Sequence, residues 1–373
     1  MDLVERAGQL KPMLRDFAMS PQFDREFSAV LEEHFPGRLV TDESLFSMVL
    51  DHFLVQHKLA SGTTVVEEFV AAHPELSDAE RDMLLGWRDV VEGTFEITGK
   101  EREAVVLFNL VDELTYRARS NLGPKSFKPL KNGMILVARL VRAGDDWMVS
   151  GNPSALPASA RNSMLPAVAE YAMSSPEAVF RNPAKLAEAR RLMAEHRATF
   201  VEMFGGDLVV VPGKEVPSKV AAFHRRLAEK ARPDREPPEP KPMDFPDHLL
   251  AADSVAIHFV EGEGLSFYPD YRLLEELFSN PALISRRPYC ETLSGFLRDP
   301  DSSPEPLRRL AARDPAKTST VFARLLKRKR GFSWNTDSEE LLRRSKPSFF
   351  DGPRLPRTVP LSGLLSDALE RAP

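Results

Sequence analysis

The residues of this chain whose types and spacing suggest contact with a charged partner lie between Leu114 and Gly144. This segment contains no Asp or Glu, and its bases are Arg117, Arg119, Lys125, Lys128, Lys131, Arg139 and Arg142. Tyr116 and Phe127 interleave with them. Cationic grooves with aromatic platforms bind nucleic acid, because cations meet phosphates and rings stack on bases. The expected contacts with RNA, DNA or another anionic partner are therefore Arg117, Arg119, Lys125, Phe127, Lys128 and Lys131.

A plainer interpretation of the same segment stays open. The stretch Asn121 to Asn132 contains glycine and proline together with spaced lysines. Lysine side chains are mostly exposed in folded proteins and keep such a loop solvated. Phe127 would then pack on the neighbouring strands, and the segment would have no ligand.

Signature motifs for nucleophiles and phosphate groups are absent from the sequence. The chain has no G-x-S-x-G, no G-x-x-x-x-G-K-[ST] and no H-E-x-x-H. Gly262-Glu263-Gly264 begins a dinucleotide pattern, but Phe267 stands where the third glycine is required. The turn of a hairpin explains these glycines without a ligand. We therefore expect no cofactor and no catalytic residue, and the sequence does not favour an enzyme.

The other chemistry-bearing residues do not form a site by their spacing. Asp51, His52 and His57 come closest to a metal-binding group, but on a helix they converge poorly on one ion. Cys290 is the single cysteine, which excludes an intramolecular disulfide and any multi-cysteine zinc or iron–sulfur site. A lone cysteine most often serves as a small buried hydrophobe. We expect no metal.

Composition and charge indicate the general class. The chain of 373 residues is 42% hydrophobic and 28% charged, which suits a globular protein of two or three domains. Its net charge of −5 is uneven, because residues 1–96 hold nineteen acids and eight bases. No apolar run approaches the ~18 residues of a membrane span, and the first residues are charged throughout. With one cysteine, this predicts a cytoplasmic protein without a membrane contact.

The N-terminal part, residues 1–88, is expected to form an acidic helical domain. Apolar residues recur at three- and four-residue spacing from Phe46 to Leu54, which places them on one helical face. Ser77 and Glu80 have the spacing of a capping box. Ser20 before Pro21 indicates another helix start. The acidic helices offer a surface for a protein partner.

A strand-rich segment follows. It contains the stretch without acids from Leu114 to Gly144, which we call the basic strip. The segments Glu103 to Val111 and Ile135 to Val141 are rich in β-branched residues, and Gly144 marks a hairpin turn into Trp147. Four or five short strands in so few residues must curl to cover their own core. We therefore expect a small OB- or SH3-like β-barrel over residues 89–157.

The rest of the chain divides at a proline-rich segment. A helical connector with one short strand is expected over residues 158–231, and a charged, extended linker over residues 232–246. An α+β domain should occupy residues 247–373, with a hairpin around Gly262, several helices and an irregular tail from Lys346.

The segment Glu305 to Arg330 has features of a helix-turn-helix. Ala311 and Val321 have the separation that lets two such helices pack. Pro315, however, stands where the tight turn needs glycine, and Arg324 stands where an apolar residue is expected. An ordinary helical hairpin with a charged outer face explains the segment better.

One family resemblance depends on the order of several motifs. "LLGW" ending at Trp87, "GTFEI" from Gly93, "GMILVARLV" from Gly133 and "WMVSGNPSALP" from Trp147 resemble uncharacterised bacterial proteins grouped near the SEC-C zinc-module family. "GLSFYPDYRLLEELF" and "PLRRLAARDP" are similar to that group as well. The zinc module needs clustered Cys and His, which this chain lacks. The resemblance therefore implies neither a zinc site nor an activity.

Together these patterns predict an α+β multidomain protein. The leading hypothesis for its function is a non-enzymatic binding or adaptor protein that contacts nucleic acid or an anionic partner through the basic strip. Two alternatives stay open. One is a protein–protein scaffold that uses the acidic helices or the linker. The other is an enzyme whose titratable groups converge in a pocket that sequence does not show.

Overall fold

The computed structural model describes residues 2–37, 42–231, 243–300, 302–327, 331–350 and 354–371. Helices and sheets are both present, so the predicted α+β class is confirmed. The chain forms two compact units. The first comprises Met1–Lys185 with Leu361–Pro373, and the second comprises Leu186–Pro360. Helix α8 (Pro183–Phe204) leads from the first into the second.

Short helices begin the first unit, and local sequence sets where several of them start. They are α1 (Leu3–Ala18), η1 (Pro21–Phe23), α2 (Asp24–His34), α3 (Glu43–Val55), α4 (Val65–Ala72) and α5 (Asp78–Gly86). The predicted capping box of Ser77 and Glu80 opens α5, and Thr64 with Glu67 does the same for α4. Ser20 precedes a single 3-10 turn rather than a full helix. These helices enclose an aromatic core that includes Phe23, Phe27, Phe53 and Phe69.

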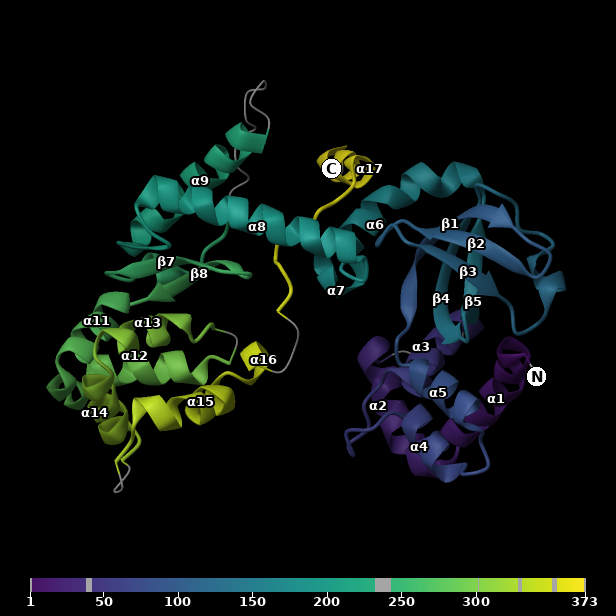
Figure 1. Ribbon diagram of the computed structural model, residues 1–373, viewed down its shortest axis with the longest axis horizontal. Coiled ribbons are helices and arrows are strands. Elements are labelled where there is room, and N and C mark those ends of the chain that lie inside the picture. The colour runs from purple at the N-terminus through teal and green to yellow at the C-terminus, as the bar shows by residue number, and fades with distance from the viewer. Residues whose placement is uncertain are drawn as a thin grey trace. The chain divides into compact units, whose positions relative to one another are not determined.

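Five strands follow and curl into a barrel (Figure 1). All neighbouring strands are antiparallel except for one parallel pair. They are β1 (Val91–Lys100), β2 (Ala104–Asn109), β3 (Thr115–Arg119), β4 (Ile135–Ala143) and β5 (Asp146–Leu156), paired in the order β1-β2-β3-β5-β4. The sheet closes because β1 pairs with both β2 and β4. The seam between β3 and β5 is narrow, with the parallel pairs Ala118–Trp147 and Arg119–Met148 alone. Five strands closed by one short seam resemble the five-stranded barrel of the OB type.

The barrel core is apolar and includes side chains from the loop between β3 and β4. Phe95, Leu107 and Leu140 fill the interior. Phe127, from the short helix η2 (Pro124–Phe127), and Leu130 join the same core. The loop is therefore packed onto the barrel by its apolar side chains.

The helices and the barrel share packing within the first unit. Val141, Ala143 and Met148 belong to the same core as the helices. The indole Nε1 of the buried Trp87 donates to the carbonyl oxygen of Arg142 at 3.0 Å. In Figure 1 the helices α1 to α5 gather at one side of the barrel strands.

The remaining elements of the first unit are helical. They are η3 (Ala158–Ala160), α6 (Arg161–Ser174), α7 (Pro176–Val179), the start of α8, and α17 (Gly363–Arg371), which packs against α6. For the segment after Lys346 the sequence predicted an irregular tail, yet α16 (Pro347–Phe350) and α17 are helical. Leu365 is buried, so packing of apolar side chains stabilises α17 despite its polar surroundings in sequence.

A three-stranded antiparallel sheet organises the second unit. Its strands are β6 (Leu208–Val211), β7 (Val255–Val260) and β8 (Gly264–Pro269), in the order β6-β7-β8. The predicted hairpin is β7 and β8. Ile257 and Phe259 face the core formed with α8 and α9 (Val216–Ala231), whereas Ala256 and Tyr268 face the other helices. Figure 1 shows helices on both sides of this sheet.

The helices on the second side follow the hairpin. They are α11 (Tyr271–Ser279), η5 (Pro281–Ser285), α12 (Arg287–Arg298), α13 (Glu305–Arg313), α14 (Pro315–Leu325), α15 (Trp334–Ser345) and α16, while η4 (Gly213–Glu215) and α10 (Asp247–Leu250) precede the hairpin. Of the expected linker 232–246, residues 232–242 lie outside the described residues.

Helices α13 and α14 form the hairpin that the sequence favoured over a DNA-binding motif. Ala311 and Val321 are both fully buried in one core. Helix α14 also contacts α11, η5 and α15, so neighbouring elements surround it. Arg324 donates to the carbonyl oxygen of Pro281 at 3.0 Å. A recognition helix must be free to enter a groove, and α14 is not presented in that way.

None of the helices in the described part of the chain combines the length and hydropathy required to cross a bilayer.

Candidate functional site

The two arginines among the expected contacts, Arg117 and Arg119, are engaged in ion pairs. Arg117 Nε lies 2.8 Å from Glu101 Oε2, and a second nitrogen pairs with Asp146. Arg119 lies 2.5 Å from Asp2 Oδ2 and 3.5 Å from Glu103 Oε2. The hydrogen bond and charge of Asp2 raise the pKa of Arg119. Carboxylates therefore compete with any anionic partner for both guanidinium groups.

The surface around these arginines carries several carboxylates. OB-type barrels bind oligonucleotides over strands 2 and 3 and the loops between strands 1 and 2 and strands 4 and 5. Here those loops carry Glu101, Arg102, Glu103 and Asp145, and Asp146 is the first residue of β5. A side-chain carbon on Gly144 would lie 3.3 Å from Leu3 of α1, so that helix also approaches the second loop. This face is acidic and partly covered.

The aromatic residues of the strip are buried. Tyr116 is 5% exposed, and its hydroxyl donates to Asp112 at 2.5 Å. Phe127, which the sequence placed among the contact residues, is 7% exposed and belongs to the barrel core. Neither ring offers a face for a base to stack on. Phe127 instead anchors the loop that carries it.

The three lysines of the strip have a different environment. Lys125, Lys128 and Lys131 are exposed and lie on residues 120–134, which we call the lysine loop. Within the part of the chain that the structure describes, none of the three has a carboxylate partner. Leu122, on the same loop, is 81% exposed. The loop thus presents three free cations and one apolar side chain to solvent.

Hydrogen bonds with β1 hold the backbone of the lysine loop in place. Lys100, the last residue of β1, donates from Nζ to the carbonyl oxygens of Phe127 at 2.6 Å, Leu130 at 3.1 Å and Lys128 at 3.2 Å. Gly133 N donates to Ile97 O at 2.8 Å. The positive φ angles of Gly123 (81°) and Gly133 (81°) allow the turns at either end. The loop is therefore preorganised rather than loosely tethered.

A second group of charged residues joins α1 and α3 to the barrel. The carboxylate of Asp51, 2% exposed, accepts from Lys11 Nζ at 2.6 Å, Ser150 Oγ at 2.6 Å and Arg139 Nε at 2.9 Å. Arg139 also pairs with Glu92 at 2.9 Å and with Gln56. Lys11 bonds Ser150 as well. Every formal charge in this Asp51 network has an opposite charge beside it.

Burial and pairing act against each other on Asp51. Burial alone raises the pKa of this carboxyl, but the charges of Lys11 and Arg139 and their hydrogen bonds outweigh it and hold the pKa below its usual value. Removing one partner from a buried pair costs about 3–5 kcal/mol, because the other charge is then left unpaired. The network fixes α3 against β4 and β5.

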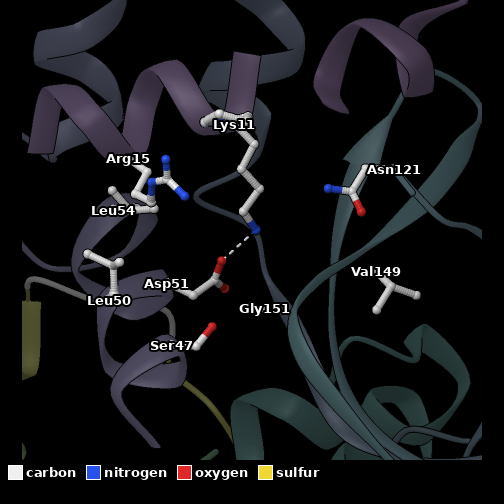
Figure 2. A pocket seen from close by; sticks show the side chains of 10 residues that line it. Lys11, Arg15, Ser47, Leu50, Asp51, Leu54, Asn121, Val149 and Gly151 are labelled. Atoms are coloured by element: carbon white, nitrogen blue, oxygen red, sulfur yellow. Dashed lines mark hydrogen bonds and ion pairs between the residues drawn. The ribbon is translucent and has the colours of Figure 1, made fainter. Parts of the chain in front are cut away.

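A pocket of about 220 Å³ opens beside this network (Figure 2). Its walls come from α1, α3, β5 and the first residues of the lysine loop: Lys11, Pro12, Arg15, Ser47, Leu50, Asp51, Leu54, Asn121, Val149 and Gly151. In Figure 2 the side chains of Lys11, Arg15 and Asn121 point toward one shared space. Titratable groups therefore converge here, as the enzyme alternative requires.

The geometry of the pocket suits binding better than catalysis. Ser150, which bonds Lys11, is 2% exposed and does not line the pocket. Ser47 does line the pocket, but within the described residues its hydroxyl has no base as a hydrogen-bond partner. Asp51 stays ionised and accepts from three donors, so it is a poor general base. A nucleophile must reach the reacting atom, and the buried Ser150 cannot.

The metal and thiol candidates do not form sites. Among the described residues no group of three or more His, Cys, Asp or Glu side chains could hold a metal ion. Asp51 is occupied by Lys11 and Arg139, and burial lowers the pKa of the nearby His52. Cys290 is half-buried, and its Sγ lies 4.0 Å from Ser294 Oγ.

The sequence did not reveal the Asp51 network, although one signal was present. Asp51 interrupts the apolar run of α3, and Lys11 sits between Leu10 and Leu14 of α1. A charged residue inside an apolar helical face needs a buried partner. The pairing of these two residues with Arg139 of β4, however, depends on tertiary contacts.

Comparisons of this chain with family models, with curated proteins and with solved structures find no match, so its function has to be inferred from its own residues.

Proposed function

We propose that this chain is a non-enzymatic cytoplasmic binding or adaptor protein that docks an acidic segment of a protein partner on the lysine loop. The observation that carries the proposal is the contrast within the basic strip. Arg117 and Arg119 are neutralised by carboxylates, whereas Lys125, Lys128 and Lys131 are exposed on a backbone fixed by Lys100.

Preorganisation favours such a contact. A loop that is already ordered loses little conformational freedom when a partner binds, so more of the interaction energy contributes to affinity. Phe127 and Leu130 anchor the loop from inside the barrel, and Lys100 anchors its carbonyl groups. The lysines can move as side chains, but their attachment points are fixed.

An acidic protein segment fits this surface better than nucleic acid does. Binding of single strands relies on exposed rings, and both Tyr116 and Phe127 are buried. Leu122 offers an apolar contact that a phosphate backbone would not use. The chain as a whole carries a net charge of −5, which disfavours a long polyanion. A short acidic segment with an aliphatic residue complements three lysines and one leucine.

The class of partner is tested by fluorescence anisotropy with four labelled probes: polyglutamate, a glutamate–leucine copolymer, single-stranded RNA and duplex DNA. We expect the copolymer to bind most tightly. Leu122→Ser should weaken binding of the copolymer about tenfold, because an apolar contact of the leucine side chain is lost. It should leave the affinity for polyglutamate unchanged. Leu364→Ser, at an exposed leucine of α17, is the matched control.

The alternatives give distinct results. Tighter binding of RNA or DNA than of the copolymer would assign the lysine loop to nucleic acid. Equal and weak binding of all four probes would discard the loop as a docking surface.

A further inference from the structure

The pocket beside the Asp51 network contains more hydrogen-bond donors than the protein itself uses. Asn121 and Ser47 have side chains that make no hydrogen bond within the described residues, and both line the pocket. Within the described residues Arg15 bonds only Asp16, its neighbour in sequence, at 2.8 and 3.0 Å. That pair is largely exposed, with side chains 55% and 69% accessible, so solvent screens it. These donors are available to a ligand.

Three separate elements position the donors. Arg15 and Lys11 lie one turn apart on α1, and Ser47 and Asp51 lie one turn apart on α3. Asn121 is fixed against α1, because a side-chain carbon on Gly8 would lie 3.1 Å from the Asn121 carbonyl oxygen. Donors that converge from separate rigid elements are typical of small-molecule sites.

The charges around the pocket leave one cation in excess. Lys11 is matched by Asp51, and Arg139 is matched by Asp51 and Glu92. In the part of the chain that the structure describes, the lining residue Arg15 has the exposed Asp16 as its one ion-pair partner. A ligand with one negative charge complements this excess cation, whereas a second negative charge would be repelled by the carboxylate of Asp51, which also lines the pocket.

The remaining wall is aliphatic. Leu50, Leu54 and Val149 line the pocket together with Pro12. Its volume of about 220 Å³ lies below the ~300–1,000 Å³ of pockets for drug-sized ligands and cofactors. The ligand must therefore be small and partly apolar.

We propose that this pocket binds a small monocarboxylate with a short aliphatic group. The carboxylate accepts from Arg15 and from the amide of Asn121, and Ser47 provides a further hydroxyl. The aliphatic group lies against Leu50, Leu54 and Val149. This site is separate from the exposed lysines, so it does not depend on the partner proposed for the lysine loop.

Isothermal titration calorimetry of the full chain with 3-methylbutanoate tests the proposal. We expect saturable binding with a dissociation constant of about 1 mM or below. Arg15→Gln should weaken it about tenfold, because a hydrogen bond between charged groups is lost. Asn121→Ala should weaken it to a smaller extent. Arg25→Gln on α2, an exposed arginine without an ion pair in the described residues, should leave binding unchanged.

Two other probes define the chemistry. 3-Methylbutanamide, which has the same shape without the charge, should not bind, and inorganic phosphate should bind more weakly than the carboxylate. The proposal is overturned if the amide binds as well as the acid, if phosphate binds more tightly, or if Arg15→Gln behaves like the unmodified chain. An absence of binding heat for 3-methylbutanoate with an unchanged thermal midpoint would also overturn it.

Discussion

The ammonium group of Lys100 lies 2.6 Å from the carbonyl oxygen of Phe127, so the end of β1 holds the loop that follows β3. The same nitrogen bonds the carbonyl oxygens of Lys128 and Leu130. The side chain of Lys100 thus binds the backbone of the lysine loop, and the side chains of Lys125, Lys128 and Lys131 on that loop are exposed.

Replacing Lys100 by methionine should loosen the lysine loop. The substitution keeps a long side chain but removes hydrogen bonds from a charged donor to three carbonyl oxygens. The contact is partly exposed, so the expected loss in free energy of unfolding is about 1–2 kcal/mol. Hydrogen exchange of the amides from Lys125 to Leu130 should accelerate.

Lys58→Met is the matched control, because Lys58 is exposed and has no ion pair among the described residues. It should leave exchange in the loop unchanged. Slow exchange in Lys100→Met would show that Phe127 and Leu130 hold the loop without the ammonium group.

Asp51→Asn should destabilise the first unit. Lys11 and Arg139 would lose the carboxylate that pairs with both, at a cost of about 3 kcal/mol. Urea unfolding followed by tryptophan fluorescence measures the effect. In a Trp334→Phe background the remaining fluorophores, Trp87 and Trp147, lie in the first unit. Asp16→Asn, at an exposed carboxylate, should have little effect.

The effect of Asp51→Asn should depend on pH in a defined direction. The folded-state pKa of Asp51 lies below its ordinary value of 3.8. Its ionised form therefore stabilises the fold above about pH 4, and this contribution is lost as the pH falls through the folded pKa. The difference between Asp51→Asn and the unmodified chain should shrink below about pH 4. A difference that stays constant down to pH 2 would contradict the assignment.

Gly213→Ala should disrupt the second unit alone. A side-chain carbon at Gly213 would overlap the carbonyl oxygen of Leu249 and lie 2.6 Å from that of Leu250 and 2.9 Å from that of Ala252. Backbone atoms cannot move aside cheaply, so we expect a loss of about 3 kcal/mol or more. Limited proteolysis should cleave within residues 186–360 and spare the first unit. Gly206→Ala, which meets only an ordinary contact at 3.9 Å, is the control.

Much of the fold could be predicted from local patterns. The capping box of Ser77 and Glu80, the strand periodicity around Ile135 and the glycines of the β7–β8 turn are local signals, and each indicated the element that the structure contains. Helix α17 was missed because its stability comes from Leu365 packing in the first unit, which is a tertiary contact.

The candidate sites were harder to predict because burial and pairing are three-dimensional. On sequence alone, Arg117 and Lys125 are both expected to contact an anionic partner, because both lie in a segment without acids. The structure brings Glu101, Asp146 and Asp2 from other elements to the arginines and leaves the lysines exposed. The pocket was not foreseen, because α1, α3 and the lysine loop are far apart in sequence.

The most direct measurement is the salt dependence with which the full chain binds the labelled glutamate–leucine copolymer. Changing Lys125, Lys128 and Lys131 together to Gln should lower affinity about tenfold at low salt and flatten the salt dependence. Changing Lys58, Lys214 and Lys327 to Gln gives the same net charge and should leave both unchanged. Equal effects of the two triple variants, or no effect of either, would contradict docking on the lysine loop.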